Sequence, residues 1–111
     1  MDDLYQELQQ KTRELDIAVN DLRRAGLTYS ACERDYKILL RTECLRLRDD
    51  KYPIGLIDKI CYGIPSVAEA RFQRDVAETQ YKVNMERINS LKLQMRLIES
   101  QISREWSVSN G

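Results

Sequence analysis

Histidine is absent from this chain, which also contains only two prolines, four glycines and three cysteines. The lack of histidine removes the commonest general base and the commonest metal ligand of proteins. The cysteines, Cys32, Cys44 and Cys61, are odd in number and show no C-x-x-C spacing, which argues against a disulfide framework and a zinc site. We therefore expect three small buried hydrophobic residues, no metal site and no cofactor.

Long apolar runs are also missing, since no segment approaches the roughly 18 residues that a membrane span needs. The N-terminal stretch MDDLYQELQQ is acidic and polar, where a signal peptide is basic and then apolar. We therefore expect a cytoplasmic protein that does not enter the membrane. Eighteen acidic residues balance eighteen basic ones, so no global field attracts nucleic acid or anionic lipid.

Catalytic motifs are likewise lacking. The sequence contains no glycine-rich phosphate loop, no G-x-S-x-G and no metal-ligand cluster. Its many carboxylates fall into i,i+4 pairs such as Glu33 and Lys37, the ordinary charge pattern of exposed helices. The 111 residues are the length of one small unit, 1–111, and we expect that unit not to be an enzyme.

What the sequence does contain is helical periodicity, beginning in the N-terminal half. From Leu4 to Leu39, apolar residues recur at alternating steps of four and three, broken only by Lys11. The segment 2–48 has no proline and a single glycine, Gly26, so it predicts one long helix. At Gly26 we expect either a bend or the close approach of a partner helix.

A second period of the same kind follows in the C-terminal half. Ser66, with Glu69 three residues later, forms a capping-box pattern, so a helix is expected to begin at Ser66. Steps of three and four then continue to Trp106, which predicts a helix over 66–106 and a polar tail over 107–111.

Between the two long segments lies DDKYPIGLIDKICYGIP, which holds both prolines. Pro53 suits the first turn of a short helix over 53–62, and Gly63 suits its left-handed C-cap. Such a helix can plug the open apolar end of a helical pair. Alternatively, Tyr52, Tyr62 and the neighbouring lysines form a recognition surface.

These elements predict an all-α fold, a long antiparallel coiled-coil-like helical hairpin with a short helix at its turn. Two helices have too little interior to bury two apolar stripes, so we expect a homo-oligomer. The residues expected in the core or oligomer seam are Leu15, Leu22, Tyr29, Tyr36, Tyr81, Ile88, Leu91, Met95, Ile98, Ile102 and Trp106.

Basic residues concentrate toward the turn. Residues 1–26 hold six acids and four bases, whereas residues 27–48 hold three acids and five bases. A hairpin would bring the basic side chains of both helices together beside tyrosines, an arrangement suited to phosphate oxygens and to stacking on a base. The candidate ligand-binding residues are Arg41, Arg48, Tyr52, Arg71 and Arg74. For each residue alone, an ordinary exposed charge beside acidic neighbours explains the pattern as well.

The strings YPIGLIDKICYG, EARFQRDVAETQYK and INSLKLQMRLIESQISREW resemble a group of small helical accessory proteins encoded by phages and prophages of Gram-positive bacteria. The resemblance covers roughly residues 30 to 106. It implies an early-expressed product of the host cytosol with no enzymatic activity, and it assigns no functional residue.

Three functions compete at this point. The first is counter-defence, in which the protein sequesters a nucleotide-derived immune signal or blocks a host defence protein. The second is an accessory role in replication or recombination through single-stranded DNA or its binding proteins, although zero net charge weakens direct DNA binding. The third is a structural coiled-coil interaction module.

Overall fold

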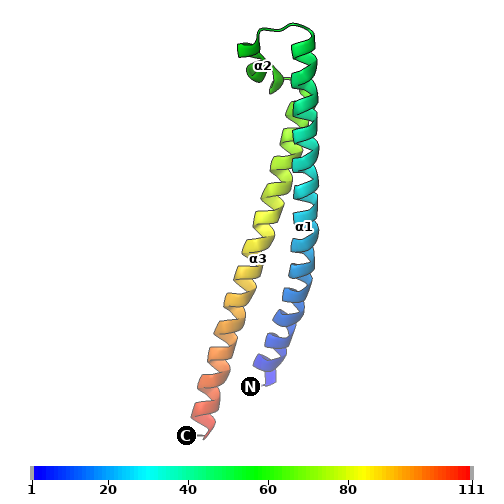
Figure 1. The fold of residues 1–111 in the computed structure, drawn as a ribbon. Coiled ribbons are helices and arrows are strands. Elements are labelled where there is room, and N and C mark those ends of the chain that lie inside the picture. Colours follow the sequence, from blue (N-terminus) through cyan, green and yellow to red (C-terminus); the bar gives the residue numbers. More distant parts are fainter. Residues whose placement is uncertain (1, 111) are drawn as a thin grey trace. The chain divides into compact units, whose positions relative to one another are not determined.

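The computed structural model describes residues 2–110 and confirms the predicted all-α helical hairpin (Figure 1). Helix α1 spans Asp2–Asp49, α2 spans Ile54–Cys61 and α3 spans Pro65–Asn110. The sequence predicts these helices over 2–48, 53–62 and 66–106. The largest difference is at the end of α3, which continues through residues 107–110, where a polar tail is expected. These residues include no proline or glycine, so each adds a helical hydrogen bond without a break.

The turn after α1 is built on a residue that the sequence does not single out. Lys51 has a left-handed backbone, with φ of 65°. The amide of Lys51 donates to the carbonyl of Arg48 (3.0 Å), and the amide of Tyr52 donates to the carbonyl of Leu47 (3.1 Å). This pair of bonds is the Schellman motif that ends many helices, here with lysine where glycine is usual.

The two predicted helix caps are wrong. No described glycine has positive φ, so Gly63 is not a left-handed cap, and Tyr62 ends α2 in a right-handed conformation. Helix α3 begins at Pro65, so Ser66 lies inside its first turn and not at the N-cap. Proline is favoured at this position because its fixed φ suits a helix and its missing N–H needs no acceptor. The carbonyl of Ile64 already accepts a hydrogen bond from Ala68 (2.9 Å).

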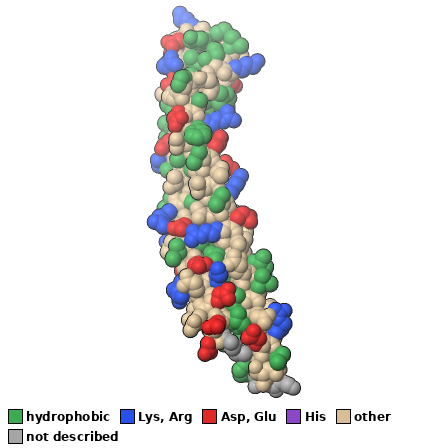
Figure 2. Space-filling model, turned by 180° about the vertical axis from the view of Figure 1, so that it is seen from behind, with side chains coloured by type: hydrophobic (Ala, Val, Ile, Leu, Met, Phe, Trp, Pro, Cys, Tyr) green, Lys and Arg blue, Asp and Glu red, His purple; other side chains and the backbone are tan. Residues whose placement is uncertain are grey.

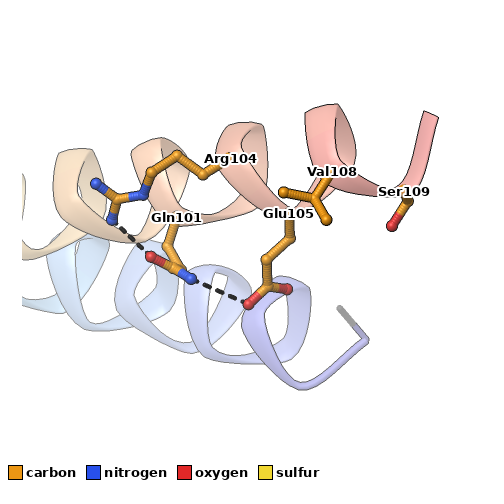
Figure 3. Close-up of a pocket in the computed structure, with 5 residues that line it drawn as sticks. All are labelled: Gln101, Arg104, Glu105, Val108 and Ser109. Atoms are coloured by element: carbon orange, nitrogen blue, oxygen red, sulfur yellow. Dashed lines mark hydrogen bonds between the residues drawn. The ribbon is translucent and has the colours of Figure 1, made fainter. Parts of the chain in front are cut away.

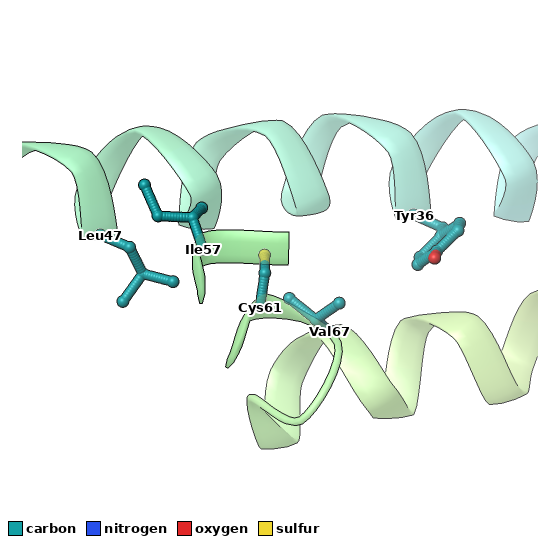
Figure 4. Packing of buried hydrophobic residues seen from close by; sticks show 5 residues of the cluster. All are labelled: Tyr36, Leu47, Ile57, Cys61 and Val67. Carbon is teal, nitrogen blue, oxygen red and sulfur yellow. The ribbon is translucent and has the colours of Figure 1, made fainter. Parts of the chain in front are cut away.

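The described residues divide into two compact units, and one of them is Ala25–Tyr81. It contains the end of α1, all of α2 and the start of α3. A cluster of five buried side chains joins these three helices: Tyr36 and Leu47 from α1, Ile57 and Cys61 from α2, and Val67 from α3 (Figure 4). The inward side of α2 therefore does plug the apolar end of the helical pair.

In the same unit, α1 passes through Gly26 as a continuous helix. The ring of Tyr81 lies so close that a Cβ added to Gly26 would be 3.3 Å from Cε2 of that ring. The rings of Tyr29 and Tyr81 also lie 6.0 Å apart between centroids. Of the two alternatives at Gly26, the close approach of a partner helix is the one observed.

The other unit consists of the described residues of Met1–Arg24 and Lys82–Gly111. Its core joins Ala18 on α1 to Ile88 and Leu91 on α3, with Leu15 and Leu22 packed against them. An ion pair links the two helices here, because Nη1 of Arg87 lies 2.8 Å from Oδ2 of Asp21.

Candidate functional site

Large apolar side chains on α2 and at its two ends are exposed to solvent. We call these exposed residues, on α2 and at its two ends, the α2 surface: Tyr52, Ile54, Leu56 and Tyr62. Ile54 is 79% exposed, whereas Ile57, three residues later, is buried. Hydrophobic side chains gather at this end of the Ala25–Tyr81 unit in the space-filling view (Figure 2). Helix α2 therefore contributes buried side chains to the plug and also carries large apolar side chains that are exposed.

A second apolar feature follows the outer side of α1 in the same unit. We call it the outer stripe, and it consists of the exposed residues Leu27, Ile38 and Leu45. Their spacing of eleven and seven residues keeps them on one side of a helix. Tyr36 and Leu47, also eleven residues apart, are buried on the opposite side. The same steps of eleven and seven are readable in the sequence, although the predicted seam does not include these residues.

On α3, exposed Phe72 and Val76 lie one helical turn apart and line a shallow hollow together with Asp75, Thr79 and Gln80. The Ala25–Tyr81 unit as a whole exposes nine large hydrophobic side chains and buries six hydrophobic ones. The nine are Leu27, Ile38, Leu45, Tyr52, Ile54, Leu56, Tyr62, Phe72 and Val76. These side chains are distributed over α1, α2, α3 and the segments at the ends of α2.

Arg74, a candidate ligand residue, already has protein partners. Its guanidinium lies 2.8 Å from Oδ1 of Asp75, 3.6 Å from Oε2 of Glu33 on α1, and 4.7 Å from the centroid of the Tyr36 ring. The hydrogen bond to Asp75 is the main cause that raises the pKa of Arg74. Two carboxylates thus compensate this charge, and its contacts join α1 to α3.

The other candidate ligand residues lie at the surface. The guanidinium of Arg71 lies over the ring of Tyr62, 5.6 Å from its centroid, at the edge of the α2 surface. Arg41 and Arg48 are exposed on α1, seven residues apart and therefore on one side of that helix. Tyr52 is exposed after the end of α1. All five candidates belong to the Ala25–Tyr81 unit, but Arg74 is held by acids while Arg71 faces an exposed tyrosine.

The candidate seam residues differ in their burial. Tyr36, Ile88, Leu91 and Ile98 are buried, and Trp106 is 59% exposed. Six others are half-buried: Leu15, Leu22, Tyr29, Tyr81, Met95 and Ile102. Most of the seam therefore faces the partner helix of the same chain, within one or other unit.

A hollow on the last turns of α3 is lined by Gln101, Arg104, Glu105, Val108 and Ser109 (Figure 3). Nη2 of Arg104 donates to Oε1 of Gln101 (2.5 Å), and Nε2 of Gln101 donates to Oε1 of Glu105 (3.1 Å). These polar groups bind one another along a single helix, so the hollow has the character of an ordinary exposed helical surface.

Within residues 2–110, no group of three or more cysteine and carboxylate side chains is placed to hold a metal ion. No described helix is long and apolar enough to cross a membrane. Comparisons of this chain with protein-family models, with curated proteins and with solved structures gave no match.

Proposed function

We propose that the protein acts by binding, as a helical assembly module whose first partner is a second copy of the same chain. The observation that carries this proposal is the outer stripe, which lies opposite the buried side of α1. A helix that is apolar on two opposite sides is typical of contact with two neighbours, and α3 is only one of them. The second neighbour is supplied by another copy.

Two further facts support a second copy as the partner. The spacing of the outer stripe is that of helix-on-helix packing, and every copy displays the same stripe, so two copies can bury it symmetrically. The formal net charge is zero, so copies do not repel one another through an overall field.

Light scattering tests this proposal directly. At micromolar concentration we expect a mass of twice 13.1 kDa or a higher multiple, and not the mass of one chain. A Leu27→Lys and Ile38→Lys double variant should be monomeric and equally helical by circular dichroism. The control, Thr28→Lys with Ser30→Lys, adds the same charge at exposed polar positions and should assemble normally. A monomeric wild type at every concentration, or a stripe variant that assembles like the wild type, would contradict the proposal.

For the biological role, the α2 surface and the phage-protein resemblance together support counter-defence by blocking a host defence protein. Four exposed apolar or aromatic residues around one eight-residue helix form a compact protein-binding surface. In bacteria that carry defined defence systems, the protein should restore phage plaques, and Ile54→Lys should abolish this protection without changing assembly. Equal protection by the Ile54 variant would exclude the α2 surface as the contact.

A nucleotide-derived signal is the second candidate ligand, and the contact between Arg71 and Tyr62 favours it. Loss of charge-assisted hydrogen bonds in Arg71→Ala should weaken a compact nucleotide about ten- to a hundredfold. Single-stranded DNA would instead lose little affinity from one substitution and would show a log–log salt slope of about −0.7 per phosphate. Titrations with cyclic dinucleotides, ADP-ribose-type signals and a labelled oligonucleotide at two salt concentrations separate these ligands. No binding at low salt would exclude both.

A further inference from the structure

Two of the three cysteines meet across the junction of α1 and α2. The Sγ atoms of Cys44 and Cys61 lie 3.2 Å apart, although the residues are 17 positions apart in the chain. The thiol of Cys44 donates toward Sγ of Cys61, and the thiol of Cys61 faces the carbonyl of Leu40 at 3.6 Å. Of the three cysteines that the sequence predicts to be small buried hydrophobic residues, Cys61 is buried, whereas Cys32 and Cys44 are half-buried.

We propose that Cys44 and Cys61 form an oxidisable dithiol site whose disulfide fastens α2 onto the end of α1. The two sulfur atoms need to approach by only about 1 Å to reach the S–S bond length of about 2.05 Å. The bond would join α1 directly to the inward side of α2, which already packs against Tyr36, Leu47 and Val67. It would thereby restrain the helix that carries the α2 surface.

The burial of the two sulfurs sets the order of the chemistry. Cys61 is 0% exposed, whereas Cys44 is half-buried. Burial first, and then the hydrogen bond shared with the Cys44 thiol, raise the pKa of the Cys61 thiol to about 11, so this thiol stays protonated at neutral pH. Cys44 is therefore the thiol that meets an oxidant, and Cys61 is the one that resolves the product.

With a small-molecule disulfide such as oxidised glutathione, the thiolate of Cys44 attacks one sulfur, forms a mixed disulfide and releases one glutathione thiolate. Cys61 then loses its proton and attacks Sγ of Cys44, and the second glutathione leaves. The protein loses two hydrogens as the oxidant is reduced to two thiols. The close contact of the two sulfurs favours this second step over attack by a distant thiol.

The experiment treats the full chain with excess oxidised glutathione at pH 8.5, quenches it with acid and alkylates the remaining thiols. We expect a loss of two hydrogens, one alkylated cysteine, and a tryptic cross-link between peptides 42–46 and 60–71. Cys32→Ser, which keeps the pair, should give the same cross-link, and Cys44→Ser should give none. A cross-link through Cys32, or only mixed disulfides after prolonged oxidation, would overturn the proposal.

A second readout tests the effect on α2. The oxidised chain should melt about 5 °C or more above the reduced chain, because the bond restrains the loop in the unfolded state. Amide hydrogen exchange in Ile54–Cys61 should slow by about tenfold or more. A cross-linked chain with unchanged melting and unchanged exchange would show that the bond does not fasten α2. These measurements concern one chain only, so their failure is distinguishable from failure of self-assembly.

Discussion

The ring of Tyr81 on α3 packs directly on Gly26 of α1, at the one place where that long helix lacks a side chain. A Cβ added to Gly26 would lie 3.3 Å from Cε2 of Tyr81, so the ring would have to move by a few tenths of an ångström. Glycine here costs the helix about 1 kcal/mol relative to alanine. The close contact with Tyr81 compensates part of that cost.

This relationship predicts a coupling between the two positions. Gly26→Ala alone should change the free energy of unfolding by less than about 1 kcal/mol, because the helical gain and the tighter contact oppose each other. In a Tyr81→Ala background the same substitution should stabilise by the full amount of about 1 kcal/mol. Urea unfolding of the four proteins of this cycle measures the difference. Equal effects in both backgrounds would mean that the ring does not restrict the site.

The left-handed backbone of Lys51 leads to a second prediction. A left-handed backbone costs a residue with a side chain roughly 1 kcal/mol, so Lys51→Gly should raise the free energy of unfolding by about 0.5 to 1 kcal/mol. Lys59→Gly makes the same chemical change inside α2 and should lower that free energy by up to about 1 kcal/mol. Chemical denaturation compares the two variants. Destabilisation by both would contradict the left-handed turn.

The unequal burial of two isoleucines on α2 predicts different outcomes for their substitution. Ile57→Ala removes a side chain from the buried cluster and should cost about 2 to 4 kcal/mol of unfolding free energy. Ile54→Ala removes a side chain that is 79% exposed and should cost less than about 0.5 kcal/mol. Thermal melts of the two variants measure whether the buried Ile57 contributes more to stability than the exposed Ile54. Similar losses of unfolding free energy at both positions would show that α2 does not pack with Ile57 buried and Ile54 exposed.

The ion pair between Asp21 and Arg87 predicts that the stability of the folded state depends on pH. Hydrogen bonds from Arg87 first, and then from Arg24, lower the pKa of Asp21 below its ordinary value of 3.8. A carboxylate with a lowered pKa stabilises the folded state above the unfolded pKa, and this contribution is lost as the pH falls through the folded pKa. Asp21→Asn should therefore be less stable than wild type at pH 7, and this difference should disappear near pH 2.

Thermal unfolding across that pH range is the measurement. Asp16→Asn, at an exposed position of the same helix, is the matched control and should show little difference at either pH. A gap between wild type and Asp21→Asn that persists in acid would mean that packing, and not the charge of Asp21, accounts for it.

The sequence by itself determined the helices, because helix formation depends on local spacing and on residues that interrupt it. Few prolines and glycines and steps of three and four specify two long helices, and the proline-bearing segment between them specifies a turn with a short helix. The helix ends were less predictable. The pattern around Ser66 suggested a cap, yet Pro65 begins α3, since several neighbouring residues suit a helix start.

Only the tertiary structure decided which contacts those helices make. Helix α1 carries apolar residues on opposite sides, and only the docking of α3 buries Tyr36 and leaves Ile38 exposed. The same docking gives Arg74 its partner Glu33, and the turn brings Cys44 to Cys61 across 17 positions. Such pairs depend on the register of one helix against another and on where the chain reverses. Residue spacing within one segment carries no information about either.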